Sequence, residues 1–296
     1  MSNATSFMYL PKVSIEASDI MILPLPYTET PSFRSGAEEG PRSIISCSHN
    51  LEYYDEDLKW DPFKRIKIAL LDEFICESGE QHIAQITDHV RSLPYEKLLI
   101  TLGGEHNITG PIIKARCQQP TTVIWIDAHL DLRESYLGSQ TNHACAARHV
   151  VEAGHRLIMI GIRSIYEKDM AYVEQNQDQI SVYLDQDLQS SSHYWDDLYH
   201  ELSLIRGDVY LSIDMDGFDP AVVPGVANPT PGGLTWYQVL FLLRHLFKVI
   251  HQNNLQLRGV DFVELIPDPT SRSEMVVCRL LIDIISKFAW NQESID

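Results

Sequence analysis

Histidine and aspartate side chains gather in three short segments of this chain, and each segment directly follows an apolar run. Imidazole nitrogens and carboxylate oxygens are common ligands for divalent metal ions. Side chains at positions i, i+2 and i+4 of an extended segment also point to the same side. The pattern therefore predicts a metal site at which a metal ion activates water. The three segments are Gly103–Asn107, Asp127–Asp131 and Asp214–Pro220.

The three segments offer more ligands than a single metal ion needs. Two imidazoles and four carboxylates are too many for one four-coordinate zinc ion and fit two ions that share carboxylates. Asp127 and Asp214 end apolar runs, where an unpaired buried carboxylate is costly without a cation. Because the set contains no thiolate, it favours Mn²⁺ or a similar divalent ion. The predicted ligands are His106, Asp127, His129, Asp131, Asp214 and Asp216.

Apolar runs that alternate with amphipathic stretches must position these ligands. Most runs are apolar at successive positions, which is typical of strands buried on both faces of a parallel sheet. The predicted strands are 20–25, 66–71, 98–102, 122–127, 157–162, 180–184, 208–213 and 257–263. The predicted helices are 79–92, 109–117, 143–153, 196–206, 235–251 and 274–288. We expect a three-layer α/β/α sandwich with a mostly parallel sheet of about eight strands, and a site beyond their carboxyl ends.

The composition limits the classes of partner. The 296 residues include 23 Lys plus Arg and 41 Asp plus Glu, which gives a net charge of -18. This charge argues against nucleic-acid and anionic-membrane partners, because both require a basic face. Such a negative charge can serve solubility alone, and it also suits a cationic ligand. Because no repeat or linker divides the chain, we expect one catalytic domain over residues 1–296.

The remaining compositional features indicate an intracellular location. Five scattered cysteines without a C-x-x-C pair are typical of reduced thiols. Residues 1–10 lack a basic segment followed by an apolar one, and no apolar stretch is long enough to span a bilayer. We therefore expect a cytoplasmic protein that makes no membrane contact.

In their order and combination, the three ligand segments resemble the signature blocks of the ureohydrolase family, which includes arginase, agmatinase and guanidinobutyrase. The resemblance covers roughly residues 20–290 and is strongest to agmatinase-like members. It implies an arginase/deacetylase-like fold, two Mn²⁺ ions per subunit and a homo-oligomer, either a trimer or a hexamer. Further similar segments are 36–44, 51–55, 160–164, 224–235 and 261–264.

The resemblance also implies how the ligands divide between the two ions. One ion would be held by His106, Asp127, Asp131 and Asp214. The other would be held by His129, Asp127, Asp214 and Asp216, with Asp127 and Asp214 bridging the two.

The implied reaction is hydrolysis of a small cationic guanidino compound. A guanidinium is a poor electrophile, and paired divalent ions lower the pKa of water enough to supply hydroxide. In the family pattern Asp131 orients the hydroxide, and His143 protonates the leaving amine as a general acid. Glu264 would bind the guanidinium nitrogens, and Asn142 would join His143 in contacting the substrate.

Agmatine is the substrate that this pattern favours, with putrescine and urea as products. Arginases carry Gly-Asn-Leu-His-Gly and an acidic residue that serve the α-amino acid end, whereas this chain has Gln140–Ala144 and Ser164 there. Departures from the agmatinase pattern at Asn107, 265–267 and 271–274 keep guanidinobutyrate, formiminoglutamate and other linear guanidino or formimino compounds as alternatives. A single-zinc deacetylase-type hydrolase and a non-catalytic family member are more distant alternatives.

Overall fold

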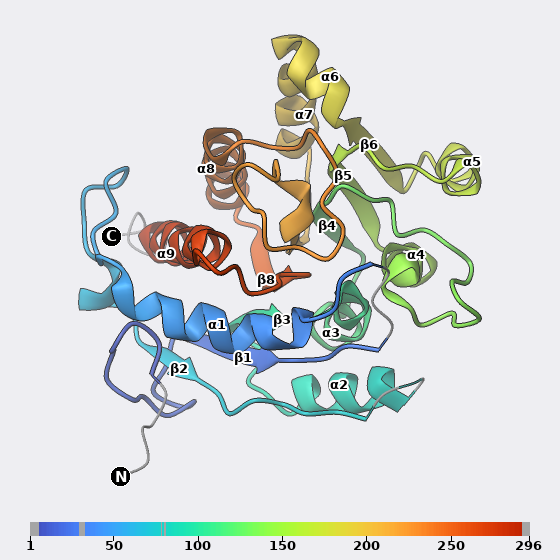
Figure 1. The fold of residues 1–296 in the computed structure, drawn as a ribbon. Coiled ribbons are helices and arrows are strands. Elements are labelled where there is room, and N and C mark those ends of the chain that lie inside the picture. Colours follow the sequence, from blue (N-terminus) through green and yellow to red (C-terminus); the bar gives the residue numbers. More distant parts are fainter. Residues whose placement is uncertain (1–5, 30–32, 78, 80, 292–296) are drawn as a thin grey trace.

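The computed structural model describes residues 6–29, 33–77, 79 and 81–291 and shows a three-layer α/β/α sandwich (Figure 1). Among these residues, eight strands form one sheet, in the order β2-β1-β3-β8-β7-β4-β5-β6. Every neighbouring pair is parallel, which confirms the predicted architecture. The strands are β1 (Ile20–Leu25), β2 (Ile68–Leu70), β3 (Leu98–Gly103), β4 (Thr121–Ile126), β5 (Arg156–Ile162), β6 (Ile180–Leu184), β7 (Asp208–Asp214) and β8 (Gln256–Val263).

Helices cover both faces of the sheet (Figure 1). One face packs against α1 (Gly40–Cys47), α6 (Asp185–Ser190), α7 (Ser192–Ser203), α8 (Trp236–Gln252) and α9 (Arg272–Asn291). The other packs against α2 (Gln81–Arg91), α3 (Thr109–Arg116), α4 (Ala146–Glu152) and α5 (Glu167–Gln175). In β1, Ile20 and Ile22 contact the first set, whereas Met21 and Leu23 contact the second. This alternation explains why the strands are continuously apolar.

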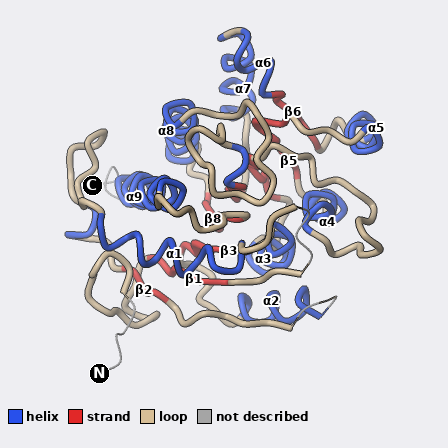
Figure 2. The backbone as a smooth tube through the Cα atoms, in the orientation of Figure 1, coloured by secondary structure: helices blue, strands red, loops and turns tan. Residues whose placement is uncertain are grey.

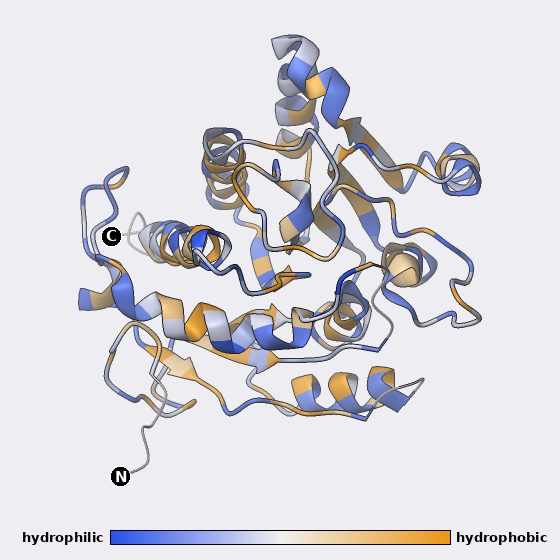
Figure 3. Ribbon diagram, in the orientation of Figure 1, coloured by the Kyte–Doolittle hydropathy of each residue, from blue (hydrophilic) through white to orange (hydrophobic). Residues whose placement is uncertain are grey.

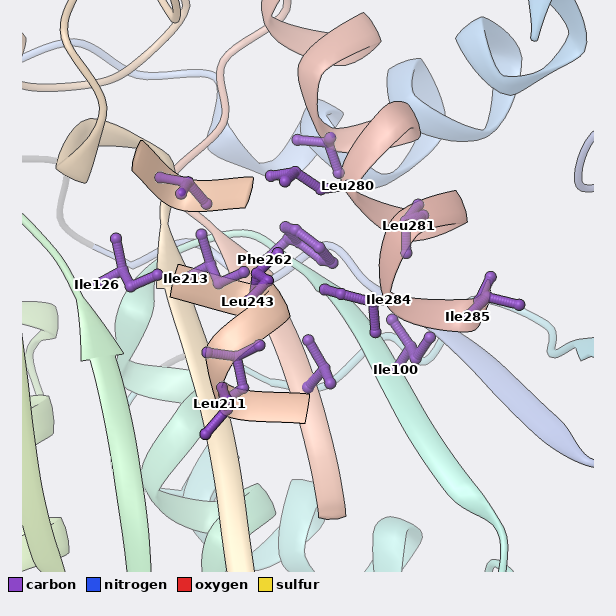
Figure 4. Packing of buried hydrophobic residues seen from close by; sticks show 14 of the residues in the cluster. Ile100, Ile126, Leu211, Ile213, Leu243, Phe262, Leu280, Leu281, Ile284 and Ile285 are labelled. Carbon is purple, nitrogen blue, oxygen red and sulfur yellow. The ribbon is translucent and has the colours of Figure 1, made fainter. Parts of the chain in front are cut away.

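The core between the sheet and α9 is densely packed with aliphatic side chains. Figure 4 shows Leu281 and Ile284 of α9 together with Phe262 of β8 and Ile100 of β3. Each of these side chains is buried, and each contributes about 1.5–3 kcal/mol relative to an exposed position. Figure 3 shows that the strands are mostly hydrophobic, whereas α8 and α9 carry both hydrophobic and hydrophilic residues.

Three helices in the structure were not predicted from the sequence: α1, α5 and α6. Helices α1 and α6 are short, and α5 buries little besides Asp169 and Val173, so none has a long apolar period. The helix predicted over 143–153 divides into the 3-10 helix η5 (His143–Cys145) and α4. The helix predicted over 196–206 begins earlier, because the Ser191 side chain accepts a hydrogen bond from the backbone N–H of His193 and caps α7.

The topology brings four strand ends together at the centre of one edge. Strands β3, β8, β7 and β4 are neighbours in that order. Figure 2 shows long loops after β4 and before α8, at the edge where these strands end. Within the described part of the chain, none of the helices has the length and apolar character needed to cross a bilayer.

Candidate metal-binding active site

The pairing register of two central strands places the acidic ligands opposite one another. Ile126 at the end of β4 pairs with Ile213 of β7, so Asp127 and Asp214 follow directly from paired positions. Asp216 lies in the 3-10 helix η6 (Met215–Gly217), and the Asp214 side chain caps that helix by accepting from the Asp216 N–H. β3 ends at Gly103, and His106 begins the 3-10 helix η4 (His106–Ile108) after Gly104 and Glu105.

One group of ligand atoms surrounds the imidazole of His106. Its Nδ1 lies 3.1 Å from Oδ2 of Asp214, 3.2 Å from Oδ2 of Asp127 and 3.4 Å from Oδ2 of Asp131. Among the described residues, this fully buried nitrogen has no partner with hydrogen-bond geometry. A buried nitrogen ringed by carboxylate oxygens, and bonded to none of them, fits a divalent cation.

A second group of ligand atoms surrounds His129 and shares Asp127 with the first. His129 Nδ1 lies 3.0 Å from Oδ2 of Asp216 and 3.6 Å from Oδ1 of Asp127. Its Nε2 lies 3.1 Å from Nδ2 of Asn228, which fixes the orientation of the ring. His106, Asp127 and Asp214 form one ligand group, and Asp127, His129 and Asp216 form the other. A shared carboxylate between two groups suits two metal ions.

The pKa shifts of Asp214 and His129 reflect the crowding of negative charge in this buried cluster. Burial, together with the charges of Asp216 and Asp127, raises the pKa of Asp214 well above its ordinary value. Burial alone would lower the pKa of His129, but the carboxylates of Asp216 and Asp127 raise it to about 12. Buried carboxylates that repel one another bind protons or metal ions to relieve the repulsion.

Asp131 reaches the cluster by a different backbone path from the one predicted. The sequence argument placed Asp127, His129 and Asp131 on one side of an extended segment. Asp131 instead has a φ of 49°, a left-handed conformation that costs about 1 kcal/mol or more in a residue other than glycine. The extended conformation is therefore wrong at Asp131, although its carboxylate still lies beside His106.

A buried hydrogen-bond network holds the His106 ring in place. Its Nε2 lies 2.9 Å from the Ser212 hydroxyl, which donates to Asp261 Oδ1 at 2.6 Å. The Thr109 and Tyr210 hydroxyls donate to the other oxygen of Asp261. Such partners orient metal-binding histidines and are known to raise their affinity for the ion. The sequence analysis placed Ser212 in a predicted strand and Asp261 in a segment similar to the family, but it gave neither residue a role.

Trp125 and Arg163 brace the ligand segments from the sides. The Trp125 ring stacks on His106 with centroids 4.0 Å apart, and its Nε1 donates to Asp127 Oδ2 at 2.8 Å. The Arg163 guanidinium donates to the backbone carbonyls of Asp216 at 2.6 Å and of Phe218 at 3.1 Å. The sequence analysis assigned no role to either residue.

Glu264 lies beside the first ligand group, at the end of β8. Its Oε1 accepts a hydrogen bond of 2.8 Å from the backbone N–H of His106, and its own N–H donates to the Gly104 carbonyl. Burial raises the pKa of Glu264 to about 7. A φ of 62° at Glu264 directs the chain out of the strand. The predicted guanidinium-binding carboxylate is thus buried next to the predicted metal ligands.

His143 and Asn142 lie at the start of η5. His143 Nδ1 is 3.7 Å from Oε2 of Glu105, and Thr28 donates a hydrogen bond to the other oxygen of Glu105. Asn142 is fully buried, and its side-chain oxygen caps η5 by accepting from the Ala144 N–H. This bond engages the side-chain oxygen of Asn142 at the start of the short helix that carries His143. Substrate contact by either residue stays a prediction.

Comparisons with known proteins agree with this architecture. The sequence profile of the arginase family matches residues 18–286. The chain is 33% identical to the "Agmatinase" of Pyrococcus horikoshii, over 93% of each protein. It is also 33% identical to the "N(1)-aminopropylagmatine ureohydrolase" of a Synechocystis strain, over 84% of this chain and 81% of that protein.

A solved structure gives the same result for the fold. The crystal structure of "agmatine ureohydrolase" from Thermoplasma volcanium superimposes with a TM-score of 0.83 at 30% identity. The match covers 95% of this chain and 94% of the other.

Proposed function

The chain belongs to the arginase family, and we propose that it is a binuclear-metal amidinohydrolase that cleaves agmatine to putrescine and urea. The observation that carries this proposal is the pair of ligand groups that share Asp127. A single-zinc hydrolase has no need for the second group, which contains His129 and Asp216. A non-catalytic protein has no need for a buried Glu264 beside the ligands.

The chain's own side chains have separate tasks in the proposed reaction. The Glu264 carboxylate binds the guanidinium nitrogens through charge-assisted hydrogen bonds. Asp131 accepts a hydrogen bond from the attacking water and so fixes its orientation. His143 gives a proton to the leaving amine nitrogen, which is a poor leaving group without it. When bound, two Mn²⁺ ions supply water whose pKa is lowered towards neutrality.

A second candidate substrate follows from the relatives. One protein that is 33% identical to this chain bears the name N(1)-aminopropylagmatine ureohydrolase. The compound N(1)-aminopropylagmatine is agmatine with an aminopropyl group added at its amine end. The guanidinium end of the two compounds is the same, so the proposed site accommodates both reactions. Guanidinobutyrate and formiminoglutamate remain the alternatives with other chain ends.

A urea-release assay tests the proposal directly. Purified protein loaded with Mn²⁺ is incubated with agmatine, N(1)-aminopropylagmatine, arginine, guanidinobutyrate and formiminoglutamate, and bound metal is counted in parallel. We expect two ions per chain and urea release that is fastest from agmatine or its aminopropyl derivative. One tightly bound ion together with no urea from any compound would contradict the proposal. The assembly into trimers or hexamers stays a prediction, which the mass of the protein in solution tests.

A further inference from the structure

A cavity of about 230 Å³ adjoins the metal-binding residues, and we call it the tail cavity. His129 and Asp131 form part of its wall, so it is continuous with the proposed reaction site. Its far side is formed by the loop after β4, through Arg133 and Tyr136, and by the start of α5, through its N-cap Tyr166 and Asp169 in its first turn.

Asp169 is the unusual member of the tail cavity. Only 5% of the surface of Asp169 is exposed to solvent. Among the described residues, no hydrogen bond or ion pair reaches its carboxylate. A buried carboxylate without a partner is costly, and burial raises the pKa of Asp169 to about 6 even though Arg133 lowers it. A cationic ligand would remove this cost by pairing with the carboxylate.

Among the described residues that line this cavity, Arg133 is the only lysine or arginine, and its guanidinium stacks on aromatic rings. Its guanidinium carbon lies 4.3 Å from the ring centroid of Tyr166 and 4.8 Å from that of Tyr136. Stacking on two aromatic rings stabilises the guanidinium without help from a carboxylate. Arg133 is also half-buried, so water solvates the rest of the group. Of the two charged groups, Asp169 therefore gains more from an incoming ligand.

We propose that the tail cavity binds the end of the substrate chain remote from the guanidinium, and that the Asp169 carboxylate receives an ammonium group there. This inference rests on the proposed guanidino hydrolysis at the neighbouring residues. It selects guanidino compounds with an amine at the far end over compounds of equal length with a methyl or carboxylate end. The exposed side chains of Ile165 and Tyr166 line the same cavity, at its outer side.

Three substrates with four-carbon chains test the proposal. Agmatine ends in an amine, 4-guanidinobutyrate in a carboxylate and n-butylguanidine in a methyl group. In Asp169→Asn we expect kcat/KM for agmatine to fall by about 10- to 100-fold, mainly through KM, as for loss of a charge-assisted hydrogen bond. We expect kcat/KM for n-butylguanidine to stay within about twofold of the wild-type value.

Glu167→Gln is the matched control, because Glu167 is an exposed acidic residue in the same first turn of α5. It removes an equal charge from the helix and should leave the preference for agmatine over n-butylguanidine unchanged. An equal loss on both substrates in Asp169→Asn would overturn the proposal while leaving the proposed function intact. A wild-type preference for 4-guanidinobutyrate that disappears in Arg133→Gln would also overturn it, because the cavity would then bind a carboxylate.

A binding measurement separates this proposal from the proposed function. Calorimetry with putrescine and n-butylamine compares two amines that differ only in the second ammonium group. We expect the Mn²⁺-loaded wild-type protein to bind putrescine more tightly, and Asp169→Asn to lose that difference. If no guanidino compound is hydrolysed but the difference persists, the proposed function fails and the amine site stands. If the wild-type protein binds both amines equally, the amine site is wrong.

Discussion

Nε2 of His106 lies 2.9 Å from the hydroxyl of Ser212, whose proton goes to Asp261. This arrangement leaves Nδ1 of His106 directed at the carboxylates of the first ligand group. The tautomer and ring orientation that metal binding requires are therefore set by a side chain on β7. An imidazole without such support loses orientation and basicity.

Ser212→Ala should weaken binding of the ion at the first ligand group by about 10- to 100-fold, because His106 loses its orienting partner. A competition titration with a chelator of known affinity measures this change. Tyr210→Phe is the control, since it removes a donor to Asp261 without touching the contact between Ser212 and His106. Equal weakening in both variants would show that Ser212 acts only through general stability of the core.

His129→Ala should reduce the bound metal from two ions to one and lower turnover by more than about 100-fold, because one ion normally supplies several kcal/mol of stabilisation. The fold should persist, since His129 is partly exposed and lies outside the apolar core. On one preparation, metal analysis measures the number of bound ions, urea release measures turnover, and circular dichroism measures whether the fold persists. Normal turnover in this variant would refute the metal assignment.

The strands were predictable because a parallel sheet leaves a strong signal in the sequence. A strand such as β1 is buried at each position, so its sequence is continuously apolar. The clustering of the candidate ligands was predictable for a related reason, because polar residues directly after such strands must meet at one edge of the sheet. Asp127 and Asp214 meet in this way at the ends of β4 and β7.

Other parts of the site depend on pairings that a single sequence does not contain. Ser212 and Asp261 are register partners on β7 and β8, and nothing local in either strand indicates that they lie side by side. The left-handed turn at Asp131 also has no clear local signal, because no glycine marks it and an aspartate adopts this conformation only occasionally. The role of Asp169 was not predicted, because α5 has almost no apolar periodicity and was itself not predicted as a helix.

His155 should make the protein less stable as the pH falls. Burial lowers the pKa of His155, and its Nδ1 accepts a hydrogen bond from the Thr121 N–H, which requires an unprotonated nitrogen. The unfolded chain binds a proton near pH 6.5, before the folded chain does, so this contribution to stability is present above that pH and is lost below it. In His155→Asn the free energy of unfolding should therefore fall less steeply between about pH 7.5 and 5.

Urea unfolding curves of the wild-type protein and His155→Asn at several pH values measure the two slopes. Asn keeps an acceptor for the Thr121 N–H but does not titrate, so the comparison isolates the proton from the hydrogen bond. Parallel slopes would contradict the assignment and would place the loss of stability in other groups.

Glu105→Gln should weaken the reaction most strongly at alkaline pH. Burial alone would lower the pKa of His143, but the neighbouring Glu105 carboxylate and the charges of Glu264 and Asp131 raise it above its usual value. A general acid works only while it is protonated, so the alkaline limb of the pH profile of kcat follows this group. Without the Glu105 charge the pKa of His143 falls, and the alkaline limb moves to lower pH.

Turnover of Glu105→Gln above neutral pH should drop by about 10- to 100-fold, part of the 10²- to 10⁴-fold that a general acid normally contributes. The pH profile of kcat, measured with saturating agmatine and Mn²⁺, shows the shift. Thr28→Val is the matched control, because Thr28 donates a hydrogen bond to Glu105 but leaves the charge in place. A uniform loss of kcat across the whole pH range in Glu105→Gln would mean that Glu105 positions His143 without controlling its proton.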